Sequence, residues 1–83
     1  MNVVLKPSVA KYLSRLNEPN KSRIKNALIK LSNEPPQGDI KSLEGRDGYR
    51  LRVGGYRVLF DVIEQEIVVY DIGLRGQIYK GGR

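Results

Sequence analysis

The chain has 83 residues and a formal net charge of +6, with 15 Lys and Arg side chains against nine Asp and Glu. The length suits a single domain over residues 1–83, and the lack of His and Cys excludes imidazole acid–base catalysis, Ser-His-Asp triads, disulfides and thiolate or imidazole metal sites. A small, strongly basic domain is expected to bind a polyanion, with nucleic acid first. No apolar run has the length of a membrane span and no signal-peptide pattern occurs, so we expect a cytoplasmic protein without metal, cofactor or membrane partner.

The first half of the sequence predicts one strand and two helices. Residues 2–6 are a short apolar run stopped by Pro7, which indicates an edge strand. A helix capped by Ser8 follows, and a second helix runs from near Asn20 to before Pro35. Both helices show the i, i+3, i+4, i+7 spacing of an apolar stripe: Val9, Tyr12, Leu13 and Leu16, then Ile24, Ala27, Leu28 and Leu31.

The short connection between these helices predicts a helical hairpin. We interpret the basic residues of the second helix as a solvated outer face: Lys21, Arg23, Lys25 and Lys30. Residues 37–47 read as a polar loop in which Leu43 turns inward.

The stretch from residue 48 to residue 79 has the period of two expected of antiparallel strands. Gly54 and Gly55 suit a two-residue type I′ turn, because both central positions of that turn require a positive φ. Counting cross-strand pairs outward from this turn places Arg52 opposite Arg57. The apolar residues of both strands then lie together on the other face of the sheet. That apolar face holds Tyr49, Leu51, Val53, Tyr56, Val58 and Phe60, and the helical hairpin is expected to cover it.

The other face carries Arg50, Arg52 and Arg57, and we call it the arginine face. Two like charges about 5 Å apart repel by about 1 kcal/mol in water and about 3 kcal/mol at an effective dielectric of about 20. A bound phosphate would replace this repulsion by charge-assisted hydrogen bonds. The alternative is a solvated face with the arginines splayed apart, and the pairing alone favours neither reading.

The turn at residues 64–66 can be read as two or three residues long. We predict three, because this pairs Val62 with Val68 and Phe60 with Tyr70 and keeps one face apolar. Asp71, Gly73 and Arg75 then lie on the arginine face. The result is an α+β domain of order β-α-α-β-β-β, with an antiparallel sheet and the helical hairpin on one face.

The residues around this hairpin resemble the RelE branch of the RelE/ParE toxin superfamily. The resemblance rests on YRLRVGGYRVLF at residues 49–60 and on IGLR at residues 72–75, with Tyr79 four positions after Arg75, and it covers nearly the whole chain. Two departures stand out. Many relatives have His where this chain has Leu74, and some have Lys at position 50 or 52.

The resemblance implies a type II toxin that enters the ribosomal A site and cleaves mRNA without a metal, and it implies a cognate antitoxin. Carried over by position, the catalytic residues are Arg52, Arg57, Arg75 and Tyr79, with Arg57 as the phosphate clamp and Tyr79 stacking on the substrate. The predicted nucleic-acid contacts are Arg50, Lys80 and Arg83. Two alternatives stay open: a ParE-like inhibitor of DNA gyrase, and a catalytically weak RNA-binding relative.

Overall fold

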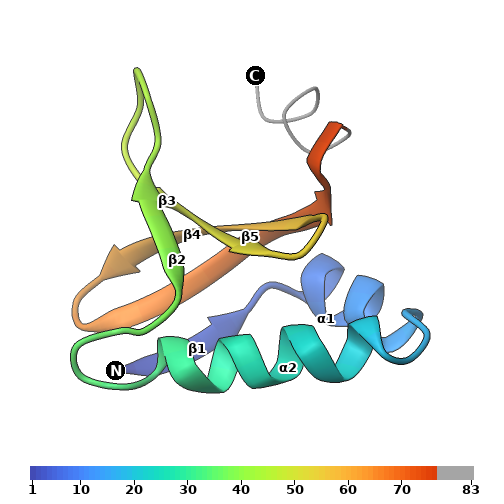
Figure 1. The fold of residues 1–83 in the computed structure, drawn as a ribbon. Coiled ribbons are helices and arrows are strands. Elements are labelled where there is room, and N and C mark those ends of the chain that lie inside the picture. Colours follow the sequence, from blue (N-terminus) through green and yellow to red (C-terminus); the bar gives the residue numbers. More distant parts are fainter. Residues whose placement is uncertain (77–83) are drawn as a thin grey trace.

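The computed structural model describes residues 1–76, which fold into two helices and five strands (Figure 1). In chain order the elements are β1 (Asn2–Leu5), α1 (Pro7–Ser14), α2 (Asn20–Leu31), β2 (Asp39–Ser42), β3 (Tyr49–Val53), β4 (Tyr56–Ile63) and β5 (Glu66–Leu74). The predicted α+β class and the β-α-α-β-β-β order are therefore confirmed, with one strand added between the second helix and the first hairpin.

The additional strand corrects the prediction of a polar loop over residues 37–47. Strand β2 pairs antiparallel with β3, placing Ile40 opposite Leu51 and Lys41 opposite Arg50. Its four residues include a single apolar side chain, so no alternation marked it in the sequence. Main-chain pairing with a neighbouring strand, rather than local propensity, makes this segment a strand.

Strand β1 lies at the far edge of the sheet, as expected of an edge strand, in the order β1-β5-β4-β3-β2. It pairs parallel with β5, whereas β2 to β5 pair antiparallel, so the sheet is mixed and not antiparallel throughout as predicted. Parallel strands need a long connection between them, and here the chain from β1 to β5 passes through both helices and the other three strands.

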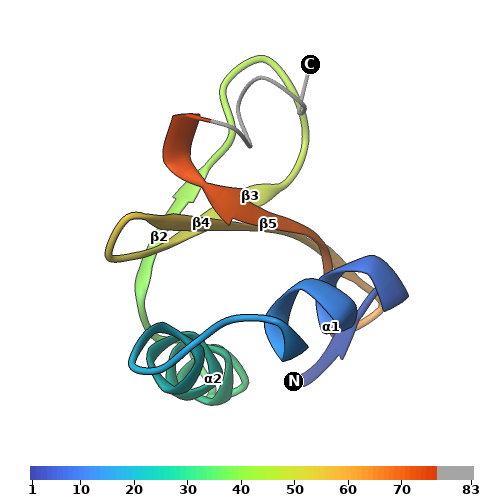
Figure 2. The same cartoon turned by 90° about the vertical axis from the view of Figure 1, so that its right-hand side faces the viewer.

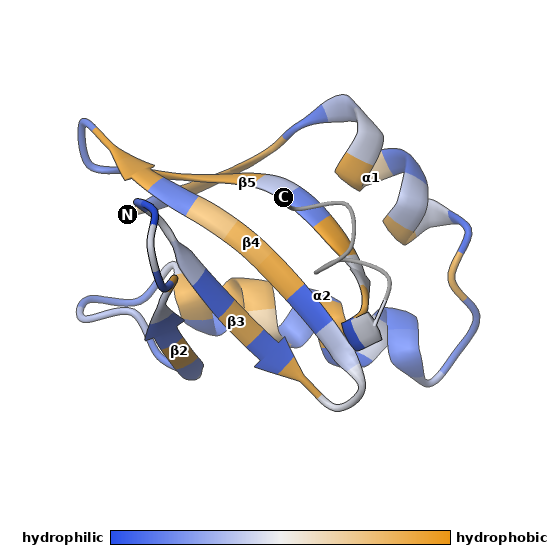
Figure 3. Cartoon of the chain, turned by 90° about the horizontal axis from the view of Figure 1, so that it is seen from above, coloured by the Kyte–Doolittle hydropathy of each residue, from blue (hydrophilic) through white to orange (hydrophobic). Residues whose placement is uncertain are grey.

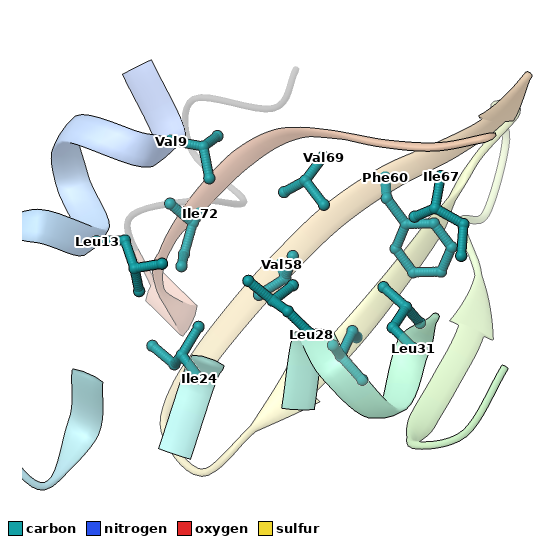
Figure 4. Packing of buried hydrophobic residues seen from close by; sticks show 11 residues of the cluster. Val9, Leu13, Ile24, Leu28, Leu31, Val58, Phe60, Ile67, Val69 and Ile72 are labelled. Atoms are coloured by element: carbon teal, nitrogen blue, oxygen red, sulfur yellow. The ribbon is translucent and has the colours of Figure 1, made fainter. Parts of the chain in front are cut away.

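Both helices pack on the same face of the sheet (Figure 2). Helix α1 begins at Pro7 with Lys6 as its N-cap, two residues before the cap predicted at Ser8, because proline is well tolerated in a first helical turn. The predicted apolar stripes are confirmed, since Val9, Leu13, Ile24, Leu28 and Leu31 are all buried. Figure 4 shows these side chains facing those of the central strands, among them Val58, Phe60, Ile67, Val69 and Ile72.

The first hairpin has the predicted register, with Arg52 opposite Arg57 and Tyr49 opposite Phe60. The rings of Tyr49 and Phe60 stack with their centroids 5.4 Å apart. The predicted turn type is wrong: Gly54 has φ +57°, but Gly55 is not in the positive-φ region, which is the pattern of a type II′ turn. Both turn types suit a two-residue hairpin, so the register is the same.

The second turn has two residues, Glu64 and Gln65, and not the predicted three. Their φ values of +49° and +66° are those of a type I′ turn, so Val62 faces Ile67 rather than Val68. A bulge then leaves Tyr70 as an extra residue on β5 between Leu59 and Phe60 of β4. Beyond the bulge Val58 faces Ile72 as predicted, because the extra residue restores the register that keeps Asp71 off the apolar face.

No helix within residues 1–76 is long and apolar enough to cross a membrane.

Candidate functional site

The arginine face lies on the side of the sheet opposite the helices, because its residues alternate along β3 and β4 with Leu51, Val58 and Phe60, which belong to the core. Figure 3 shows the hydrophilic residues interrupting the apolar stretches of these two strands. Arg52 on β3 is paired directly with Arg57 on β4, and Arg57 is paired with Gly73 on β5. Glycine has no side chain, so β5 leaves room beside the Arg57 guanidinium. The strand pairing therefore brings two of the predicted catalytic arginines side by side.

Arg75 is brought to the same end of the sheet by the main chain. Its backbone N–H donates a hydrogen bond of 3.0 Å to the carbonyl oxygen of Gly55, in the turn between β3 and β4. The side chain of Arg75 is exposed. Three arginines, at positions 52, 57 and 75, thus come from three consecutive strands or their ends.

Burial divides these arginines into two kinds. Arg57 is only 6% exposed and Leu59, two residues further along the same face, only 2%, whereas Arg52 and Arg75 are exposed. A buried guanidinium is held in one orientation and is poorly solvated, and both properties strengthen its interaction with an incoming anion.

Arg50 is also buried, at 8% exposure, and it is bound to β2. Its Nη1 donates to the carbonyl oxygen of Asp39 at 2.9 Å and to the Asp39 carboxylate at 3.3 Å. The guanidinium of Arg50 therefore fastens β2 to β3 in this structure, and its predicted contact with nucleic acid stays a prediction.

The loop between β2 and β3 adds a contact that the sequence did not reveal. This loop stands above the sheet on the side away from the helices (Figure 2). From it, Arg46 Nη2 donates a hydrogen bond of 2.8 Å to the hydroxyl of Tyr70, and the guanidinium lies 5.9 Å from the Tyr70 ring centroid. Arg46 and Tyr70 are 24 residues apart and meet at the bulge, which no local pattern predicts.

An ionised carboxylate on the arginine face can accept a proton. Asp71 faces Leu59 across the strands and is diagonal to Arg57, and its Oδ1 accepts a 2.9 Å hydrogen bond from the N–H of Ile72. Tyr12 is no such group, because burial, helped by the nearby Tyr56, raises the pKa of its hydroxyl. Within residues 1–76 no three His, Cys, Asp or Glu side chains are grouped as metal ligands would be.

Three of the predicted site residues, Tyr79, Lys80 and Arg83, lie outside the described residues. The structure thus brings Arg52, Arg57 and Arg75 to one end of the sheet and binds Arg50 to Asp39.

Comparison with known proteins gives the family. The model of a family described as the ParE toxin of the type II toxin–antitoxin system parDE matches residues 3–79. The chain belongs to the RelE/ParE toxin superfamily. No curated protein sequence matches the chain.

Solved structures of RelE proteins share the fold of this superfamily member. A chain of the RelE–RelB complex from Pyrococcus horikoshii is 30% identical, with a TM-score of 0.76 and coverage of 92% of this chain and 96% of that one. A chain of the RelB–RelE antitoxin–toxin complex from Methanococcus jannaschii is 24% identical, with a TM-score of 0.79 and coverage of 96% and 99%. The isolated Escherichia coli RelE toxin is 20% identical, with a TM-score of 0.74 and coverage of 98% and 93%. The recognition of a RelE-like member of the superfamily is thereby confirmed.

Proposed function

We propose that this toxin-family protein is a ribosome-dependent endoribonuclease that cleaves mRNA in the A site. One observation carries the proposal: Arg52 and Arg57 are direct cross-strand neighbours, and Arg75 is tied by its backbone to the turn that joins their strands. Like charges so placed repel one another, and a phosphate between them relieves the repulsion. A surface that only contacts protein has no need of this arrangement.

In the proposed reaction the 2′-oxygen of a ribose attacks the adjacent phosphorus. The bond from phosphorus to the 5′-oxygen of the next nucleotide breaks, leaving a 2′,3′-cyclic phosphate and a 5′-hydroxyl. Arg57 neutralises the charge that develops on the phosphate oxygens, and Arg75 does so at the leaving oxygen. The 2′-hydroxyl gives its proton to a base, and water supplies the proton that the leaving 5′-oxygen takes up.

Guanidinium groups stay protonated at any ordinary pH, so the proton from the 2′-hydroxyl needs another acceptor. Asp71 is the described carboxylate that lies diagonal to Arg57 on the arginine face, and we assign it this role. Tyr79 is proposed to stack on a base of the substrate, while Lys80 and Arg83 add contacts to the RNA backbone.

The proposed partners are a cognate antitoxin, the ribosome and mRNA. An antitoxin is supported by the likeness to chains from RelB–RelE antitoxin–toxin complexes of Methanococcus jannaschii and Escherichia coli. The net charge of +6 fits an acidic protein partner as well as RNA. We also propose that the protein acts in the cytoplasm.

Inhibition of DNA gyrase is the second candidate function, because the family model that matches the chain is described as a ParE toxin. The two functions differ in their products. A nuclease leaves truncated mRNA with cyclic-phosphate ends, whereas a gyrase inhibitor changes the topology of plasmid DNA and leaves mRNA intact.

A translation extract programmed with a defined mRNA tests the proposal. We expect wild-type protein to produce mRNA fragments ending in a 2′,3′-cyclic phosphate, and we expect Arg57→Ala and Arg75→Ala to abolish both the fragments and growth arrest. Arg57→Met keeps the buried stem of that residue, and so separates loss of charge from misfolding. Arg15→Ala, at an exposed arginine at the end of α1, is the matched control and should keep activity.

The assignment of the arginines is wrong if the Arg57 and Arg75 variants fold and still arrest growth. Asp71→Asn should bind RNA and fail to cleave it. Tyr79→Phe should keep more activity than Tyr79→Ala if the ring only stacks, whereas equal loss would assign the function to the hydroxyl.

A further inference from the structure

A groove of about 350 Å³ lies between α2 and the end of β3, beside the arginine face. Arg23 and Lys30 line it from the helix and Arg52 lines it from the strand, with Ala27 and Val53 between them. The three cationic side chains are exposed, and no hydrogen bond or ion pair within residues 1–76 holds any of their side chains. This arrangement goes beyond the solvated helix face expected from the sequence, because two helical cations share a concave surface with a residue of the site.

The groove has little negative charge of its own to balance these cations. Asp39 is the carboxylate among its lining residues, and its side chain accepts a hydrogen bond of 3.3 Å from Arg50. Three cations around one groove repel one another, so an anionic ligand is favoured there.

The spacing of the cations indicates a polymer rather than a single small anion. Arg23 and Lys30 are seven residues apart, which is about 10 Å along a helix. One phosphate cannot contact both side chains at that distance without drawing them together, whereas successive phosphates of one strand can. Arg52 also belongs to the arginine face, so a strand that leaves the proposed cleavage site over Arg52 runs directly into the groove.

We propose that this groove binds the backbone of single-stranded RNA on one side of the cleaved bond, with Arg23 and Lys30 each neutralising a phosphate. The proposal rests on the proposed ribonuclease function, since it extends the path of the same substrate. An acidic peptide matches the charges of the groove, but it has no need to continue onto the arginine face through Arg52.

Binding can be measured apart from cleavage with a 5′-fluorescein 12-nucleotide RNA whose riboses are all 2′-O-methylated, because this ligand has no attacking hydroxyl. Fluorescence anisotropy gives the Kd of the full-length protein between 50 mM and 500 mM salt. The test protein, which we call the groove variant, carries Arg23→Gln with Lys30→Gln. The matched control carries Lys11→Gln with Lys25→Gln, which removes the same charge from exposed helical positions outside the groove. Thermal unfolding by circular dichroism checks that both proteins keep the fold.

Each phosphate contact on a single strand contributes about −0.7 to the slope of log K against log salt. The groove variant should therefore bind about tenfold more weakly at about 0.15 M salt, with a slope less negative by about 1.4. The control variant should stay within about twofold of wild type. Equal effects of the two variants, or no effect of either, would overturn the proposal, because the charge would then act without regard to position.

A fluorescent, glutamate-rich amphipathic 15-residue peptide tests the other occupant. If the groove variant loses the peptide and keeps wild-type affinity for RNA, the groove is a protein-docking site and the proposal is wrong. Failure of the proposed function looks different. In that case the translation extract yields no cyclic-phosphate ends with wild-type protein, while the groove variant still loses affinity for the methylated RNA.

Discussion

Replacing Arg50 by alanine tests whether this arginine of the proposed site holds the fold together or contacts RNA. The structure favours the first role, because the side chain is buried and donates to both the main-chain carbonyl and the carboxylate of Asp39. We expect Arg50→Ala to release β2 from β3 and to lower the free energy of unfolding substantially.

The size of the loss follows from the contacts. Hydrogen bonds to a charged group contribute about 1.5–3 kcal/mol. The two stem methylenes that alanine lacks add about 0.8 kcal/mol each when buried. Removing the Arg50 charge also relieves its repulsion with the neighbouring Lys41 and Arg52, which stabilises the variant by up to about 1 kcal/mol. The net cost is then about 2–5 kcal/mol, against a total stability of about 4–12 kcal/mol for a chain of this length.

Two further variants separate the contributions. Arg50→Met keeps the stem and removes the same charge, so it should cost the hydrogen bonds less the relieved repulsion, about 0.5–3 kcal/mol. Asp39→Asn keeps the bond to the main-chain carbonyl and should cost less than about 1 kcal/mol, because the Asp39 side chain is 52% exposed.

Urea unfolding followed by circular dichroism measures these differences, in an Arg75→Ala background that limits toxicity during expression. The order expected is Asp39→Asn, then Arg50→Met, then Arg50→Ala, from least to most destabilised. The reasoning is refuted if Arg50→Ala unfolds at the wild-type urea midpoint yet loses affinity for the methylated RNA. Arg50 would then be a direct contact to nucleic acid.

Three other predictions concern the frame that carries the site. Replacing Glu64-Gln65 by Asn-Gly should raise the Tm by about 8–16 °C, since positive φ costs ordinary side chains about 1 kcal/mol at each of these two positions, and an unchanged Tm would contradict the type I′ geometry. Ile24→Ala should lower the free energy of unfolding by about 2–5 kcal/mol in urea titrations, because Ile24 is fully buried between helix and sheet; a loss below about 1 kcal/mol would contradict this packing. Hydrogen bonds from Ser22 lower the pKa of the Glu18 carboxyl, so its contribution to stability is present above the pKa of the unfolded chain and disappears as the pH falls through the folded pKa. An NMR titration should place the Glu18 midpoint below that of an unstructured Glu, and Glu18→Gln should remove this acid dependence.

The sequence by itself determined the features that depend on neighbours in the chain. The spacing of Val9 and Leu13, and of Ile24 and Leu28, identified the buried face of each helix. A two-residue turn at Gly54-Gly55 set the register that places Arg52 opposite Arg57. These features can be predicted from the sequence because helical periodicity and hairpin pairing depend on residues only a few positions apart. The hairpin register is also well determined, because a slip of one residue would move all the apolar side chains of a strand to the wrong face of the sheet.

Only the tertiary structure decided the features that join distant segments. Strand β2 exists through its pairing with β3, and the ion pair of Asp39 with Arg50 belongs to that pairing. The bulge at Tyr70 allowed a two-residue turn and an apolar core to coexist, where sequence reasoning had to choose between them. The groove arises because α2 packs beside the end of β3, which brings Arg23 and Lys30 next to Arg52. These contacts join residues that are 20 or more positions apart in the sequence, and a periodicity read over a few neighbouring residues cannot predict which distant segments will pack together.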